Sequence, residues 1–151
     1  MYQRILVPVD GSSTAQRGLT EAIRLARLTG GQLRLLHQID ALSMTSAMGA
    51  YAPFSNDVFA QMRSDGEKLL EEARAQAIAE GVAADVVLDD GVHSRLAEWV
   101  TEQVQAWPAD VVVLGTHGRR GVGRMLLGSD AEQVLRLCPV PVLLVRSPDT
   151  E

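Results

Sequence analysis

The stretch RILVPVDGS, Arg4–Ser12, contains the pattern that decides the fold: an apolar run that ends at Asp10, Gly11 and Ser12. The apolar residues stand at consecutive positions, which is typical of a strand buried on both faces. The following residues have the spacing of an amphipathic helix, with Ser12 or Ser13 as its candidate N-cap. The stretch therefore predicts a buried strand that passes through a short turn into a helix.

Apolar runs of this kind alternate with longer segments of helical spacing along the whole chain. The predicted strands are Arg4–Val9, Gln32–Ile39, Ala84–Leu88, Asp110–Leu114 and Val140–Val145. The predicted helices are Ala15–Leu28, Asp57–Glu80, Ser94–Gln105 and Asp130–Leu137, and the aperiodic Ser43–Pro53 is predicted to be a loop. Because right-handed crossovers place each connecting helix over the sheet, this alternation predicts an α/β fold with a parallel sheet and helices on both faces.

Length and composition are consistent with a single domain over residues 1–151, since 46% of the 151 residues are hydrophobic. The formal net charge of -5 argues against a protein that coats nucleic acid or an anionic membrane, because those partners need a basic surface. The single cysteine, Cys138, cannot form an internal disulfide and is interpreted as core filler. The chain has neither a signal-peptide pattern nor an apolar run of about 18 residues, so we expect a cytoplasmic protein without a membrane span.

A glycine-rich stretch follows the fourth predicted strand, at the end of the strand where open parallel sheets bind ligands. Glycine lets backbone N–H groups approach an anion closely, and arginine neutralises phosphate charge. The glycines are Gly115, Gly118, Gly121 and Gly123, and the stretch also holds His117, Arg119, Arg120 and Arg124. His117 is either a contact to phosphate or base, or an exposed loop residue. The pattern favours an anion site over a solvated loop.

The last predicted helix begins just after this stretch, with Ser129 as its candidate N-cap behind Gly128. A helix N-terminus offers unpaired N–H donors and the positive end of a dipole, which together favour phosphate. Two familiar phosphate motifs are absent: no Gly-Lys-Ser/Thr follows, and Leu126 stands where a dinucleotide fingerprint needs its third glycine. The expected site is therefore a phosphate site of another kind.

Asp10 is the candidate second wall of this site. It serves either as a turn residue, since Asp-Gly is a common turn pair, or as a carboxylate that accepts a ribose hydroxyl or a metal-bound water. In a doubly wound sheet the first and fourth strands are neighbours where the winding reverses, so their loops form one crevice. That crevice would suit a nucleotide.

With these residues in view, the chain resembles the universal stress protein family, in its ATP-binding type, over nearly its whole length. The nucleotide signature of that family, Gly-x2-Gly-x9-Gly-Ser/Thr, is met by Gly115, Gly118, Gly128 and Ser129. RILVPVDGS, LRLLHQID and CPVPVLLVR look like the family's first, second and last strands. The resemblance implies a five-stranded sheet of order 3-2-1-4-5.

The resemblance also implies roles for residues at the site. Pro8 and Val9 would lie near adenine and Asp10 would face the ribose. The motif glycines would line the phosphates, and Ser129 would meet the terminal ones.

The chain departs from the family pattern at two positions. Gln38 stands where the family usually has an aliphatic residue beside adenine, so it would either hydrogen-bond the base or weaken apolar packing on it. Asp130 often has an apolar counterpart; it either favours the helix dipole or holds Mg²⁺ with the triphosphate.

Other candidate sites are weaker. His37, His93 and His117 lack the spacing of zinc ligands. The pair Asp89-Asp90 before Gly91 is better interpreted as the turn that ends a strand than as an acid/base pair.

The expected function is regulatory: adenine nucleotide, as ATP or as ADP or AMP, would tune conformation or the binding of an unknown protein partner. No motif supplies a general base for attack on phosphate, so at most slow hydrolysis is expected. A slow ATPase or phosphotransferase and a nucleotide-free interaction module are the two alternatives. The apolar last strand, Val140–Arg146, would lie at a sheet edge and pair with a second copy, giving a homodimer as in the family.

Overall fold

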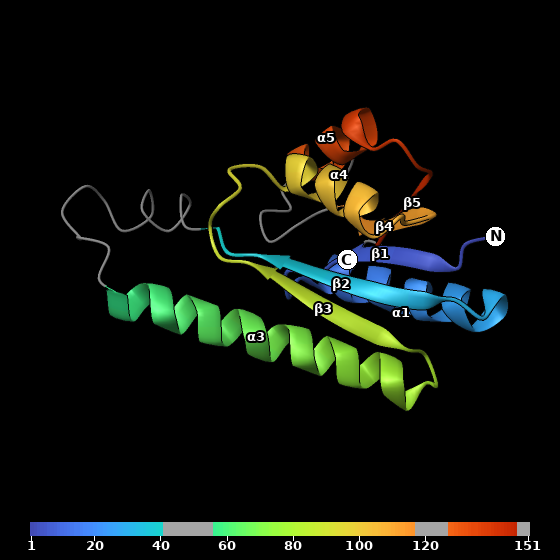
Figure 1. Ribbon diagram of the computed structural model, residues 1–151, viewed down its shortest axis with the longest axis horizontal. Helices are drawn as coiled ribbons and strands as arrows, with labels where there is room; N and C mark the ends of the chain where they lie inside the picture. The colour runs from blue at the N-terminus through green and yellow to red at the C-terminus, as the bar shows by residue number, and fades with distance from the viewer. Residues whose placement is uncertain (41–55, 117–126, 148–151) are drawn as a thin grey trace.

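The computed structural model describes residues 1–40, 56–116 and 127–147. It shows one five-stranded sheet of order β3-β2-β1-β4-β5, in which every pair of neighbouring strands is parallel (Figure 1). The strands are β1 (Arg4–Pro8), β2 (Gln32–Gln38), β3 (Ala84–Asp89), β4 (Val111–Gly115) and β5 (Val142–Val145). The helices are α1 (Ser13–Thr29), α3 (Asn56–Ala79), α4 (Leu96–Ala106) and α5 (Ser129–Leu137). The predicted α/β class and strand order are confirmed.

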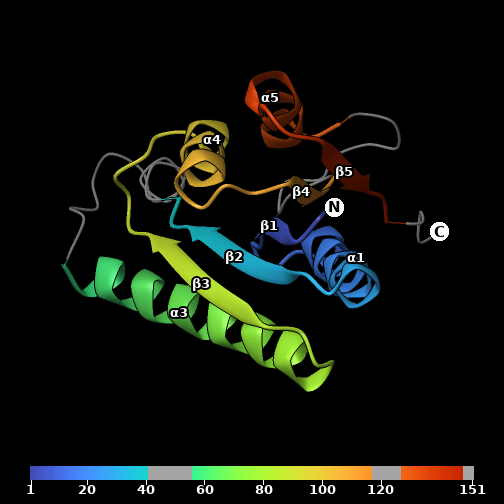
Figure 2. The same cartoon turned by 45° about the vertical axis from the view of Figure 1, so that its right-hand side comes forward.

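The sheet separates two apolar cores, because successive side chains of a strand point to opposite faces. Ile5 and Val7 of β1 pack into the core under α1 and α3, whereas Leu6 packs into the core under α4 and α5. Figure 2 shows these two helix pairs on opposite sides of the sheet. All three β1 side chains are 0% exposed, which explains why the strand is apolar at consecutive positions.

Helix α1 begins two residues before and ends one residue after the predicted Ala15–Leu28, and its N-cap is one of the two predicted serines. Ser12 is the N-cap, and its side chain accepts a hydrogen bond from the backbone N–H of Ala15. At the other end Gly30 has a φ of +71°, a left-handed conformation that favours glycine, and its N–H donates to the carbonyl of Ala26. Arg27, which fitted the predicted apolar stripe, is exposed.

Helix α3 continues through Gly66. A Cβ at this position would lie 2.9 Å from Cδ2 of His37 and 3.1 Å from Cδ1 of Leu88, so the glycine lets the helix approach β2 and β3 closely. One side of α3 faces the core: Leu70, Ala73 and Ala77 are buried, and Phe59, Met62 and Leu69 are half-buried. The predicted loop Ser43–Pro53 lies outside the described residues.

Six of the nine predicted element starts were wrong by one or two residues, those of α1, α3, α4, α5, β4 and β5. Strand β5 begins at Val142 and not at Val140, because Pro141 has no N–H and joins the sheet only through its carbonyl, which accepts from Val112. Helix α4 begins at Leu96 and not at Ser94, and α5 begins at Ser129. Trp107 follows α4 as its C-cap.

None of the helices in the described ranges combines the length and the apolar character needed to cross a membrane.

Candidate functional site

Strand β1 lies where the winding of the sheet reverses. It pairs with β2 on one side and with β4 on the other, where Ile5 lies opposite Val111 and Leu6 opposite Val112. The carboxyl ends of β1 and β4 therefore meet at one edge of the sheet, the usual place of ligand binding in open α/β folds. The predicted neighbourhood of the first and fourth strands is confirmed.

Pro8 and Val9 end β1 at this edge. Pro8 is buried and lies opposite Leu36 of β2. Val9 is buried as well; its N–H donates to the carbonyl of Leu36 at 2.7 Å, and its own carbonyl lies 2.8 Å from Nδ1 of His37. The backbone beside the crevice is thus fixed by β2.

The turn after β1 is held by hydrogen bonds among its own residues. Oδ1 of Asp10 accepts from the backbone N–H of Ser12 at 2.8 Å, and Gly11 between them has a φ of +81°. Asp10 is half-buried. Its turn role, one of the two predicted, is confirmed, and its role toward a ribose or a metal-bound water stays a prediction.

Gly115 ends β4 in direct contact with the backbone of α1. A Cβ on this residue would lie 2.8 Å from both the carbonyl carbon and the oxygen of Thr14, and 3.0 Å from the nitrogen of Ala15. Gly18, on the next turn of α1, lies against the same strand end, since its Cβ would be 3.4 Å from the nitrogen of Gly115. The packing of helix on strand therefore requires glycine here, independently of any phosphate.

The connection between β4 and α5 begins and ends at adjacent points of the sheet edge. Thr116 is buried, and its N–H donates to the carbonyl of Val145 at 3.1 Å. Its carbonyl accepts from the N–H of Gly128 at 2.8 Å. This backbone bond places the start of α5 directly beside the end of β4.

The glycine-rich stretch itself lies outside the described residues. This holds for the site candidates His117, Gly118, Arg120 and Gly121, and for Arg119, Gly123 and Arg124.

The start of α5 corrects the predicted cap. Gly128 is the N-cap, with φ of -57° and ψ of 149°, and it makes no side-chain cap hydrogen bond. Ser129 is the first helical residue and not the cap, and Asp130 is the second; both are exposed. A glycine cap leaves N–H donors of the first turn without a side-chain acceptor, as a phosphate site needs. Asp130 and Glu132 are acidic residues in this first turn, where their charges interact favourably with the positive end of the helix dipole.

Gln38 ends β2 two strands away from β4, and its carboxamide is fixed. Its Nε2 donates to Oδ2 of Asp89 at 3.1 Å and to the backbone carbonyl of His93 at 3.0 Å. The predicted turn at Asp89-Asp90 is confirmed: Asp89 accepts from the N–H groups of Val92 and His93, both at 3.3 Å. The turn therefore holds Gln38 in one orientation.

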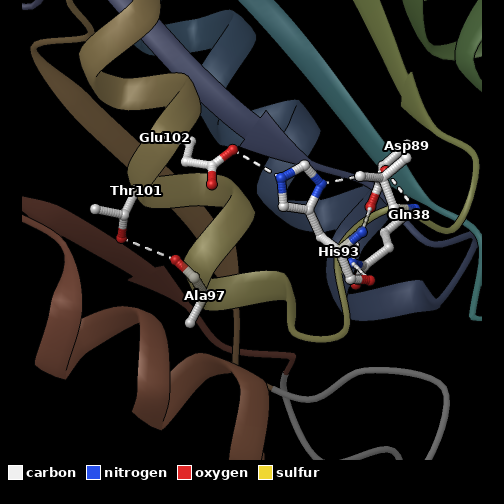
Figure 3. A network of polar contacts seen from close by, with 7 residues as sticks. Gln38, Asp89, His93, Ala97, Thr101 and Glu102 are labelled. Carbon is white, nitrogen blue, oxygen red and sulfur yellow. Dashed lines mark hydrogen bonds and ion pairs between the residues drawn. The ribbon is translucent and has the colours of Figure 1, made fainter.

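A polar network around His93 was missed by the sequence interpretation. The ring lies between Asp89 and Glu102 and stacks on Trp99, as Figure 3 shows for the two carboxylates. No spacing motif signals this arrangement, because one carboxylate comes from the end of a strand and the other from the second turn of a helix. The only available sign was a histidine four residues after a strand-ending aspartate.

Comparison with known proteins agrees with this architecture. The model of the universal stress protein family matches residues 1–146. The chain is 30% identical over 151 residues to the universal stress protein YxiE of Bacillus subtilis, a match that covers 97% of this chain and 100% of that protein. The solved structure of MJ0577 from Methanocaldococcus jannaschii has a TM-score of 0.82 and 24% identity, and the match covers 99% of each chain.

Two further solved structures of similar fold contain adenine nucleotides. One is the universal stress protein of Archaeoglobus fulgidus in complex with dAMP, with a TM-score of 0.68, 22% identity, and coverage of 95% of this chain and 98% of that one. The other is a universal stress protein in complex with cAMP, with a TM-score of 0.68, 22% identity, and coverage of 97% and 99%. From the family match over residues 1–146, this chain belongs to the universal stress protein family.

Proposed function

We propose that this chain is a single-domain regulatory protein of the cytoplasm that binds adenine nucleotide at the edge formed by the carboxyl ends of β1 and β4. ATP is the proposed ligand, with ADP or AMP as further adenylates. The observation that carries the proposal is the bond from Gly128 N–H to the carbonyl of Thr116, because it sets the N-terminus of α5 beside the crevice where the winding reverses. The dAMP and cAMP complexes of similar proteins support an adenine nucleotide.

The proposed roles follow the positions of the residues. Pro8 and Val9 would contact the base, and Asp10, beside its turn bond, the ribose. Gly115, Gly118, Gly121 and Gly128 would let backbone N–H groups approach the phosphates, while His117, Arg120 and Ser129 would contact the phosphates directly.

Asp130 would hold Mg²⁺ together with the phosphates. Among the described residues no group of three or more His, Cys, Asp and Glu side chains could hold a metal ion, so Mg²⁺ would need phosphate oxygens as ligands.

Gln38 would present a hydrogen-bond acceptor to the base. Its carboxamide nitrogen donates hydrogen bonds to two protein oxygens, one of Asp89 and one of His93. The carboxamide oxygen is then the group left for a ligand, and an acceptor suits the 6-amino group of adenine better than the 6-oxo group of guanine.

Calorimetric titration with ATP, ADP and AMP, each with and without Mg²⁺, tests the proposed site. We expect binding that Gly128→Val abolishes, because the new side chain would stand where the phosphates approach. Gly128 has a φ of -57°, which any residue adopts, so the variant should keep its fold.

Ala79→Val, at the exposed end of α3, is the matched control and should bind like the natural chain. Equal binding by both variants, or no binding by nucleotide-free natural protein, would leave the interaction module as the better interpretation.

Two further parts of the proposal concern turnover and assembly. Single-turnover hydrolysis of labelled ATP with Mg²⁺, set against a protein-free blank, tests the slow ATPase alternative.

Strand β5 is an edge strand with Leu143 43% exposed, which favours a homodimer through Val140–Arg146. Analytical ultracentrifugation of the natural chain and of Leu143→Lys tests that interface.

A further inference from the structure

The imidazole of His93 lies between two carboxylates that differ in their access to water. Nε2 is 2.7 Å from Oε2 of Glu102 on α4 and forms a hydrogen bond with it, whereas Nδ1 is 3.3 Å from Oδ1 of Asp89 at the end of β3, an ion-pair distance without hydrogen-bond geometry (Figure 3). The side chain of Asp89 is 4% exposed and that of Glu102 is 62% exposed. The ring also stacks on Trp99, with centroids 6.1 Å apart.

These two carboxylates are the charged groups that face the ring in the described part of the chain. Asp89 is held in place by the N–H groups of Val92 and His93 and by Gln38 from β2. Glu102 makes no such set of bonds, and its exposed carboxylate can exchange His93 for water. One carboxylate is therefore fixed and the other is mobile.

We propose that His93 is a proton-controlled clamp that ties the turn after β3 to α4 when both ring nitrogens carry a proton and that releases Glu102 when one is lost. Carboxylates only accept hydrogen bonds, and a neutral imidazole has a single N–H. One of the two contacts must therefore break on deprotonation. Because Asp89 is buried, a lone pair on Nδ1 would face its carboxylate without water between them, so the remaining proton stays on Nδ1 and Glu102 turns to solvent.

The balance of forces on the ring fixes the direction of the pH dependence. Burial lowers the pKa of His93, but the hydrogen bond to Glu102 and the charge attraction of both Asp89 and Glu102 outweigh burial and raise that pKa above the ordinary 6.5. A folded-state pKa above the unfolded one means that the clamp contributes its full stability below pH 6.5 and loses it as pH rises through the higher folded value.

The clamp acts on the same turn that orients Gln38, since Gln38 donates to both Asp89 and the carbonyl of His93. Its other end, α4, packs against α5 in one core. Neither the clamp nor its release depends on nucleotide, so the clamp stands if the proposed function fails.

NMR titration of the natural full-length chain tests the clamp. Long-range ¹H–¹⁵N spectra of the three histidines, with His93 assigned from His93→Gln, report both the pKa and the tautomer. We expect a pKa above 6.5 for His93 and the Nδ1–H tautomer at high pH. The ¹³Cδ signal of Glu102 should show a step at the same pH, and that step should disappear in His93→Gln.

Glu102→Gln should lower the pKa of His93, whereas Glu98→Gln, which removes an exposed carboxylate one turn earlier on α4, should leave it unchanged. The Nε2–H tautomer, a His93 pKa at or below 6.5, or a Glu102 signal without the step would each overturn the clamp. All three readings are made on the natural chain, and for them His93→Gln serves only to assign the His93 signals.

Discussion

Two connections meet at the carboxyl edge of the sheet, and they are built differently. The turn from β1 to α1 is held by bonds within four residues, from Ser12 to Asp10 and from Ala15 to Ser12. The connection from β4 to α5 is held by bonds to distant residues, from Gly128 to Thr116 and from Thr116 to Val145. The turn from β1 to α1 is therefore stabilised by local hydrogen bonds, whereas the connection from β4 to α5 needs the assembled sheet.

These two connections lie together because α1 packs closely on the end of β4. Among the variants considered, Gly115→Ala should disturb this packing and lower the free energy of unfolding the most. The added Cβ would lie 2.8 Å from backbone atoms of Thr14, and neither backbone can give way without moving a helix or a strand. We expect a loss of about 1–3 kcal/mol in the free energy of unfolding, measured by urea denaturation. Gly128→Ala, at an ordinary φ of -57°, should change stability by less than about 0.5 kcal/mol, and equal losses in the two variants would contradict the packing explanation.

Ser12→Ala tests the locally built turn. It removes the cap bond to Ala15 N–H, so we expect a loss of about 1 kcal/mol in the free energy of unfolding. The matched control is Ser13→Ala, because Ser13 is the exposed first residue of α1 and not its cap. If both alanine variants lose the same stability, the capping role of Ser12 is wrong.

Ser129→Ala should have the smallest effect on folding. Ser129 is the first helical residue of α5 and makes no cap bond, so stability should change by less than about 0.5 kcal/mol. Calorimetry with ATP on the same variant separates a structural role from a ligand role, because the proposed phosphate contact would be lost. A stability loss like that of Ser12→Ala would mean that the serine caps the helix after all.

The sequence predicted most reliably what depends on local patterns. Consecutive apolar residues in Ile5, Leu6 and Val7 revealed a strand covered on both faces, and the strand order followed from the family resemblance. The Asp-Gly-Ser turn after β1 was predictable because its bonds join near neighbours. Whether Asp10 also contacts a ligand could not be predicted, because the same Asp-Gly-Ser sequence suits both a turn and a ligand contact.

What the sequence did not show depends on contacts between distant segments. Gly115 is needed because backbone atoms of Thr14 leave no room for a side chain there. Its position in the motif had predicted only a role in phosphate binding. The preference of serine for N-caps placed α5 one residue late, because the hydrogen bond from Gly128 to Thr116 is invisible in the sequence. The clamp around His93 was missed for the same reason: it joins β3, a turn and α4.

The bond between Gly128 and Thr116 also has a consequence for how such a protein can diversify. It joins the residue after β4 to the N-cap of α5, so both ends of the connection are anchored in the scaffold. Loop-closure entropy grows only slowly with length, so a change in the length of that connection should cost little stability while this bond keeps β4 and α5 in place. The connection is thus a suitable position for grafting a longer recognition segment, with thermal stability nearly constant as its length changes.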